Sequence, residues 1–100
     1  MIRWYRPKDP TPTEQCPCCD YISLSERGQY LICPICFWED EGLDIDTPDE
    51  YSGPNHGTLR KARKNFEEFG ACDKQMVVNV IPVVDRKQYE RVVRVLPPSC

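Results

Sequence analysis

Four of the seven cysteines in this chain form two closely spaced pairs. Cys16 and Cys19 make one C-x2-C pair, and Cys33 and Cys36 make a second pair after 13 intervening residues. Zinc takes four ligands at the corners of a tetrahedron, and each C-x2-C turn presents two sulfur atoms to one ion. The spacing therefore predicts a four-thiolate metal site, with these four cysteines as the metal ligands and zinc as the ion.

Proline follows the first cysteine of each pair, and its fixed φ angle stiffens both turns. A closed four-thiolate site leaves no coordination position for a substrate, so we expect a structural ion whose binding contributes on the order of 10 kcal/mol to folding. Iron also suits four thiolates, and the sequence leaves it open. Disulfides need an oxidising compartment and a thioredoxin-like motif needs a βαβ pattern, and neither is indicated here.

The remaining cysteines and the single histidine are weaker candidates for chemistry. Cys18 lies inside the first pair and is either a small spectator or a thiol activated by the nearby cation. Cys72 and Cys100 are expected to be free thiols, and Cys72 also suits the core. His56 lies in a loop of glycine, proline and asparagine, where a surface or capping role is favoured over a ligand or a catalytic base.

Composition and motifs argue against several classes of protein. The chain has 100 residues and a net charge of -3, which fits one domain and disfavours nucleic-acid binding through bulk charge. It contains no nucleophilic triad, no phosphate-binding loop and no H-E-x-x-H motif, so we expect neither catalytic residues nor an organic cofactor. No 18-residue apolar run and no signal-peptide pattern is found, which predicts a cytoplasmic protein without a membrane segment.

Short strands are needed to position the cysteine pairs. Residues 21–24 and 29–32 favour two strands joined by a turn at Gly28, forming a hairpin that links the two pairs. Residues 1–15 contain three prolines and favour an irregular lead-in, from which Trp4 and Tyr5 can dock on the body. Phe37 and Trp38 follow the last cysteine and are expected to pack over the metal turns.

A helix is predicted over residues 58–69. Its apolar residues recur at helical spacing and would form one face: Leu59, Ala62, Phe66 and Phe69. Thr58 or Asn55 can cap its start, and Gly70 suits the left-handed position after its end. Lysines and arginines crowd residues 60–64, which opposes the helix macrodipole. We expect the acidic segment 39–50 to fold back on this basic cluster, with a partner's phosphate or carboxylate as the alternative.

The last quarter of the chain favours a strand followed by a helix. Residues 76–84 are β-branched and apolar, and residues 85–96 place apolar side chains at helical spacing before Pro97. The predicted fold class is therefore α+β: a zinc-ribbon-like hairpin core, a packed helix, and a C-terminal strand plus helix. We expect a single domain over residues 1–100, with the core at 15–73 and an extension at 74–100.

The ordered motifs resemble a known family. They are CPCC at residues 16–19, CPICFWED at 33–40, SGPN at 52–55 and FGAC at 69–72. This string is similar to the cysteine-rich CPCC family of small bacterial proteins, over about residues 15–73. The resemblance implies a zinc-ribbon-like core followed by a helix, no catalytic residues to transfer, and an unknown biochemical function with a hint of toxin–immunity neighbourhoods.

Three functions are compatible with these features. The favoured one is a non-catalytic protein-interaction module that presents residues 39–50 or 76–84 to an unidentified protein partner, most concretely as an immunity protein that neutralises a basic toxin. The second is a nucleic-acid-binding zinc ribbon that uses residues 60–64, which the net charge makes unlikely. The third is a thiol-reactive or metal-handling protein that uses Cys18, Cys72 and Cys100. The sequence does not indicate the oligomeric state.

Overall fold

The structure is a computed structural model that describes residues 12–98. The predicted docking of Trp4 and Tyr5 and the role of Cys100 lie outside these residues. Six short strands precede the main helix: β1 (Glu14–Gln15), β2 (Ile22–Leu24), β3 (Leu31–Ile32), β4 (Glu39–Asp40), β5 (Tyr51–Ser52) and β6 (Gly57–Thr58). The helix α1 (Leu59–Phe69) follows, and two 3-10 helices, η1 (Lys74–Asn79) and η2 (Val83–Gln88), come after it.

The strands form three separate antiparallel hairpins, β1–β2, β3–β4 and β5–β6. The prediction that residues 21–24 pair with 29–32 is therefore wrong, although β2 and β3 lie within the two predicted segments. Each pairs instead with the strand on the other side of its own cysteine turn. The reason is local, because each C-P-x-C turn reverses the chain and brings its own flanks together at a low cost in loop entropy. Gly28 does adopt the expected left-handed conformation, at φ 72°.

The helix α1 agrees with its prediction at both ends. The Thr58 side chain accepts a hydrogen bond from the Lys61 amide, and Gly70 ends the helix at φ 83° while its amide donates to the Phe66 carbonyl. The buried residues of α1 are Leu59, Ala62 and Phe66. Phe69, the fourth member of the predicted face, is exposed on the last turn of the helix, where the Lys74 ammonium lies over its ring.

The predicted C-terminal strand is wrong, and of the predicted helix over residues 85–96 only residues 85–88 are helical, as part of η2. Residues 76–79 belong to η1, residues 83–84 belong to η2, and residues 80–82 connect the two. The chain is extended after Gln88, with one isolated bridge between Tyr21 and Arg91. Asp73 starts η1 by accepting a hydrogen bond from the Gln75 amide, and Pro82 immediately precedes η2. Strand formation depends on a partner edge, and no strand within residues 12–98 pairs with these valines, so their β-propensity is overridden.

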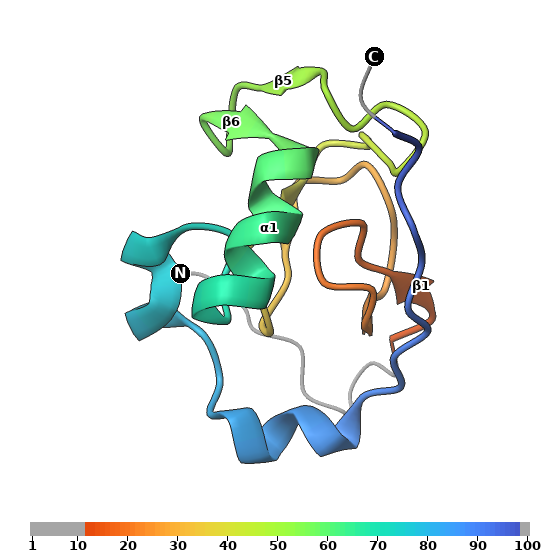
Figure 1. Ribbon diagram of the computed structural model, residues 1–100. Helices are drawn as coiled ribbons and strands as arrows, with labels where there is room; N and C mark the ends of the chain where they lie inside the picture. The colour runs from red at the N-terminus through yellow and green to blue at the C-terminus, as the bar shows by residue number, and fades with distance from the viewer. Residues whose placement is uncertain (1–11, 99–100) are drawn as a thin grey trace.

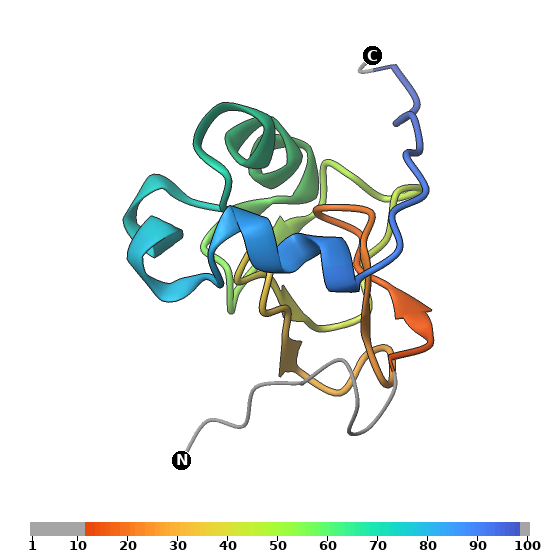
Figure 2. The same ribbon diagram turned by 90° about the horizontal axis from the view of Figure 1, so that it is seen from below.

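The core is small and is built around sulfur. The fully buried side chains include Trp38, Leu24, Ile35 and Leu59, and they surround the paired cysteines. Figure 1 shows α1 lying over the chain that carries the cysteines, while the extended C-terminal segment passes alongside β1. The view from below shows η2 crossing the molecule between η1 and this segment (Figure 2). Among residues 12–98, no helix combines the length and the apolar character that crossing a bilayer requires.

Candidate metal centre

Two turns of the same backbone geometry carry the paired cysteines. In the first knuckle (residues 16–21), the Cys16 amide donates to the Tyr21 carbonyl at 2.8 Å, and the Asp20 amide donates to the Cys16 carbonyl at 3.0 Å. The second knuckle (residues 33–38) repeats both bonds, at 3.0 and 2.9 Å. The fifth residue of each knuckle is left-handed, Asp20 at φ 68° and Phe37 at φ 71°. Each turn thus directs two sulfur atoms inward.

The four sulfur atoms converge on one point. All Sγ atoms of Cys16, Cys19, Cys33 and Cys36 lie within 4.8 Å of one another. The Cys16 and Cys36 Sγ atoms are 3.6 Å apart, and those of Cys19 and Cys33 are 3.7 Å apart. A tetrahedral ion with Zn–S bonds of about 2.3 Å separates its sulfur ligands by about 3.8 Å. The group is therefore able to hold a metal ion of this size.

The donor set also fits a divalent cation chemically. Burial raises the pKa of Cys16 to about 11 and raises the pKa values of Cys19 and Cys36 well above that of a free thiol. Burial acts in the same direction on Cys33, but hydrogen bonds from the other three thiols and from Ser23 outweigh it and lower the pKa of Cys33. Four buried thiolates without a counter-charge are thus unfavourable, and a bound cation removes that penalty.

Cys33 receives additional hydrogen bonds that suit a coordinating thiolate. The Ser23 hydroxyl lies 3.0 Å from the Cys33 Sγ, and the Ile35 amide donates to the same sulfur at 3.4 Å. Ser23 is fully buried on β2, so it joins the first hairpin to a ligand of the second. Such outer contacts orient ligands and tune a metal site.

The backbone of the first knuckle is held by arginine side chains. Arg63 Nη1 donates to the Pro17 carbonyl at 2.6 Å, and Arg91 Nε donates to the Cys19 carbonyl at 2.9 Å. Arg94 Nη2 reaches the Cys16 carbonyl at 3.3 Å. These three donors come from α1 and from the extended C-terminal segment.

Asp20 organises two of these arginines. Its buried carboxylate accepts two hydrogen bonds from the Arg63 guanidinium, one from Arg94 Nε and one from the Arg94 amide, at 2.8 to 2.9 Å. Burial alone would raise the pKa of Asp20, but the bonds from Arg63 and Arg94 outweigh it and lower the pKa below the ordinary value. Asp20 is therefore charged at neutral pH and fixes both guanidinium groups over the first knuckle.

The second knuckle is held by main-chain amides instead. The Cys72 amide donates to the Cys36 carbonyl at 2.7 Å, and the Ile81 amide donates to the Pro34 carbonyl at 3.1 Å. Both donors follow α1, one directly after Gly70 and Ala71 and the other between η1 and η2.

A second buried carboxylate stabilises the loops beside β4. Asp40 accepts hydrogen bonds from the Arg27 guanidinium, from the Gly28 amide at 2.8 Å and from the Gly42 amide at 3.2 Å. Arg27 also pairs with Asp44 at 2.8 Å. Two residues of the acidic segment thus serve internal contacts rather than the surface.

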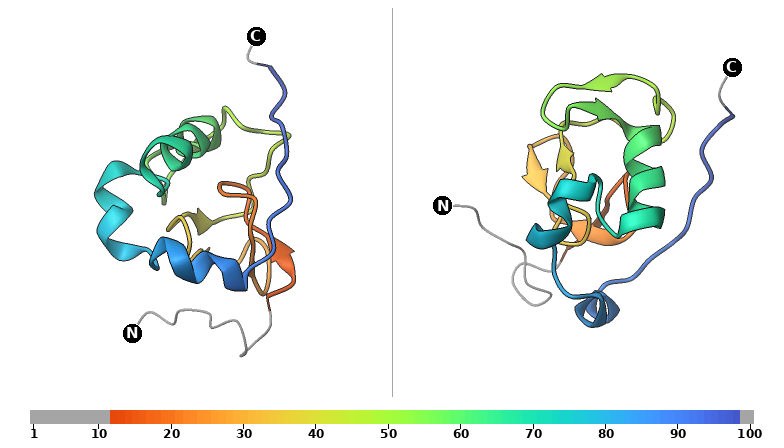
Figure 3. Two further views of the ribbon diagram at one scale, coloured as in Figure 1. Left: turned by 60° about the horizontal axis from the view of Figure 1, so that its bottom comes forward. Right: turned by 60° about the vertical axis from the view of Figure 1, so that its left-hand side comes forward.

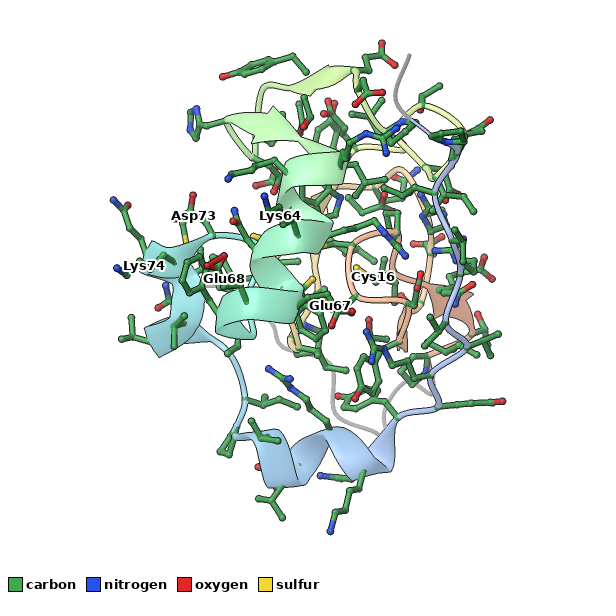
Figure 4. All side chains as sticks on the ribbon, in the orientation of Figure 1. Cys16, Lys64, Glu67, Glu68, Asp73 and Lys74 are labelled. Atoms are coloured by element: carbon green, nitrogen blue, oxygen red, sulfur yellow. The ribbon has the colours of Figure 1, made fainter. Side chains whose placement is uncertain are left out.

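The expected contact between the acidic segment and the basic cluster forms at one position. Arg60 pairs with Asp49 at 2.8 Å, whereas Arg63 turns inward to Asp20. Lys64 and Glu68 lie on the outer face of α1, and Cys16 lies on its inner side (Figure 4). Two basic residues in the first half of α1 therefore have acidic partners on other parts of the chain: Asp49 for Arg60 and Asp20 for Arg63.

The other candidates from the sequence are not among the four grouped ligands, although Cys18 and Cys72 share the buried core with them. Cys18 and Cys72 are buried, at 3% and 8% exposure, and burial raises the pKa of Cys72 above that of a free thiol. His56 is exposed in the turn between β5 and β6 at φ 56°, and it is not one of the four grouped ligands. Both His56 and Cys72 line a cleft of about 320 Å³ beside Phe37.

Sequence reasoning missed the role of Asp20, Arg63 and Arg94. One signal was present, because an aspartate directly after a C-x2-C pair occupies the left-handed position, which Asp tolerates better than most residues. The partner arginines carried no such signal, because their contacts span 43 and 74 residues of sequence.

The hairpins, the helix and the buried sulfur cluster define a small α+β protein that is built around a four-cysteine site able to hold a metal ion. The family model described as Cysteine-rich CPCC matches residues 14–87, so the chain belongs to that family. The match extends 14 residues beyond the expected end of the resemblance at residue 73. Neither a curated protein nor a solved structure matches the chain.

Proposed function

We propose that this protein is a non-catalytic zinc protein in which the ion holds the fold together and the surface binds another protein. One observation carries the metal part of the proposal: four fully buried sulfur atoms within 4.8 Å of one another. Cys16, Cys19, Cys33 and Cys36 would be the ligands. An ion bound there supplies folding free energy, and its closed coordination leaves no position for a substrate.

Elemental analysis tests the identity of the ion. Protein that is purified under reducing conditions is expected to contain one zinc per chain, and removal of the zinc by a chelator is expected to abolish the far-ultraviolet signal of α1. One iron per chain contradicts the zinc assignment. A metal-free protein that keeps its fold contradicts the structural role.

The surface supports a role in protein binding. Valines on η1, η2 and the extended C-terminal segment are exposed: Val77, Val78, Val83, Val84, Val92, Val93 and Val95. These exposed apolar side chains are available for contact with a partner. Because residues 76–84 do not form a strand, binding by strand addition through that segment is not proposed.

Acidic groups also remain for a basic partner, and inhibition of a toxin is the most concrete form of the proposal. Asp46 and Glu50 are exposed on the loop before β5, and an acidic patch there would steer a basic partner during association. A pull-down with the double variant Asp46→Lys and Glu50→Lys is expected to lose a basic partner that the unmodified protein retains. Glu68→Lys, on the outer face of α1, is the control for a charge reversal outside the acidic segment. Equal recovery with all three proteins contradicts the acidic surface as the binding site.

No specific observation favours the other two functions. Arg60 and Arg63 of the basic cluster are paired with aspartates, so fewer charges are available for phosphate than the sequence suggests. Cys18 and Cys72 are buried, which disfavours rapid reaction with thiol reagents.

A further inference from the structure

The extended segment over residues 89–98, here called the strap, runs along the first knuckle. Figure 3 shows this segment passing from the end of η2 along the side of the molecule. Its backbone is tied to the first hairpin by hydrogen bonds from the Ile22 amide to the Glu90 carbonyl at 2.8 Å and from the Val92 amide to the Asp20 carbonyl at 3.3 Å. Gln15 Nε2 bridges the Val92 and Asp20 carbonyls, at 2.6 and 2.8 Å.

Two arginines of the strap reach the backbone of the knuckle. Arg91 donates to the Cys19 carbonyl, and Arg94 donates to the Cys16 carbonyl and to the Asp20 carboxylate. Cys16 and Cys19 are the two cysteines of the first pair, so the strap holds the carbonyl groups of both.

The strap is held mainly by polar contacts. Tyr89 is buried at its start, but Val92, Val93 and Val95 are 50%, 67% and 87% exposed. Only one isolated β-bridge pairs it with the rest of the described chain. A segment with few buried apolar contacts opens locally at a lower free energy than the core does.

We propose that the strap is a clasp that retains the metal by holding the first knuckle closed, with Arg94 as its main positioning residue. This inference rests on the proposed metal binding. When the strap opens, Asp20 and the carbonyl groups of Cys16 and Cys19 lose donors, and the two first-pair ligands become free to leave before Cys33 and Cys36. Both clasp arginines lie beyond residue 87, where the family match ends.

Zinc release to an excess of chelator tests the clasp. Loss of an outer partner commonly weakens metal affinity by about 10- to 100-fold, so Arg94→Ala is expected to release zinc faster within that range. Arg94→Lys retains the charge and should recover part of the difference. Lys87→Ala changes the net charge equally on an exposed residue of η2 and should release zinc at the rate of the unmodified protein.

Alkylation of the zinc-loaded protein, read by mass spectrometry, separates a clasp from a general loss of stability. In Arg94→Ala, Cys16 and Cys19 should be modified before Cys33 and Cys36. An unchanged release rate, or equal acceleration at all four cysteines, overturns the clasp.

A third variant decides the question if Arg94→Ala does not fold. Gln15→Ala removes one tie to the strap and leaves the Asp20 carboxylate intact, so it should accelerate release roughly fivefold, as expected for one hydrogen bond. No acceleration in Gln15→Ala would then overturn the clasp. An unmodified protein that binds no metal contradicts the proposed function, and the clasp with it.

Discussion

The two knuckles share one backbone geometry and differ in what surrounds them. In the first knuckle, the carbonyl groups of Cys16, Pro17 and Cys19 accept hydrogen bonds from arginine side chains, and one main-chain amide, that of Val92, reaches the Asp20 carbonyl. The carbonyl groups of the second knuckle accept hydrogen bonds from the Cys72 and Ile81 amides. A hydrogen bond from a side chain requires a particular residue type and, here, its charge. A hydrogen bond from a main-chain amide can be donated by any residue except proline. The first knuckle is therefore the more sensitive of the two to mutation, pH and salt.

The difference follows from where the chain goes after α1. The segment that leaves Gly70 runs directly beside the second knuckle and supplies its amides there. After α1, the segment that contacts the first knuckle is the strap, whose few main-chain bonds are supplemented by the Arg94 guanidinium at Asp20. Asp20, Arg63 and Arg94 stabilise the first knuckle only while all three are present, because loss of one leaves a buried charge without its partner.

Loss of a metal ligand should have the largest effect and should not distinguish the knuckles. Cys16→Ser and Cys33→Ser are each expected to lose most of the metal-binding free energy, on the order of 10 kcal/mol, and with it the fold at neutral pH. Circular dichroism in the presence of zinc measures this loss. Cys18→Ser, at a buried cysteine outside the cluster, should keep its zinc. Retention of a native spectrum in both ligand variants would contradict a structural ion.

Loss of the Asp20 carboxylate should distinguish the knuckles. Asp20→Ala leaves Arg63 and Arg94 without their shared partner, and breaking a buried ion pair in this way costs about 3–5 kcal/mol. Ile81→Pro removes one main-chain donor to the second knuckle and should cost about 1 kcal/mol more than Ile81→Ala, which is the reference because the Ile81 side chain packs against the core. Denaturant unfolding of the zinc-loaded proteins measures both values. Equal losses would show that the charged partners add nothing to the first knuckle.

Acid should remove the advantage of Asp20. Because its pKa is lowered in the folded protein, its contribution is complete above the unfolded value near 4 and is lost as the pH falls through the folded value. The difference in the free energy of unfolding between the unmodified protein and Asp20→Asn should be constant from about pH 5 to 7 and shrink below about pH 4. Protonation of the thiolates affects both proteins equally and cancels. A difference that grows on acidification would contradict the lowered pKa.

The surface pair should have the smallest effect. Arg60 pairs with Asp49, which is exposed, and such pairs contribute little to stability. Asp49→Ala is expected to unfold at nearly the same denaturant concentration as the unmodified protein. If Asp49→Ala lowers the free energy of unfolding nearly as much as Asp20→Ala does, then the contact between the acidic segment and α1 contributes as much as the buried network around Asp20.

The sequence predicted the features that depend on local chemistry. The spacing of four cysteines was sufficient to predict the group that the structure brings together, and Thr58, Gly70 and the apolar spacing located α1 to within a residue. The positive φ of Gly28 was also foreseen from residue type. Each of these predictions rests on residues close together in the chain.

The features that were missed depend on distant contacts. The predicted pairing of β2 with β3 is wrong because Gly28 favours a hairpin turn between them, whereas the chain reverses at each cysteine turn and pairs each strand across that turn. The valines of residues 76–84 were interpreted as a strand because propensity does not indicate whether a partner edge exists. The Asp20 network joins residues up to 74 positions apart, a separation that no short pattern encodes.

X-ray absorption spectroscopy at the zinc edge tests the central claim most directly, since it reports the ligands of the bound ion. The account predicts one zinc per chain, with four sulfur neighbours at about 2.3 Å and no oxygen or nitrogen neighbours. Fewer than four sulfur atoms, or coordination by His56 or carboxylates, would contradict it.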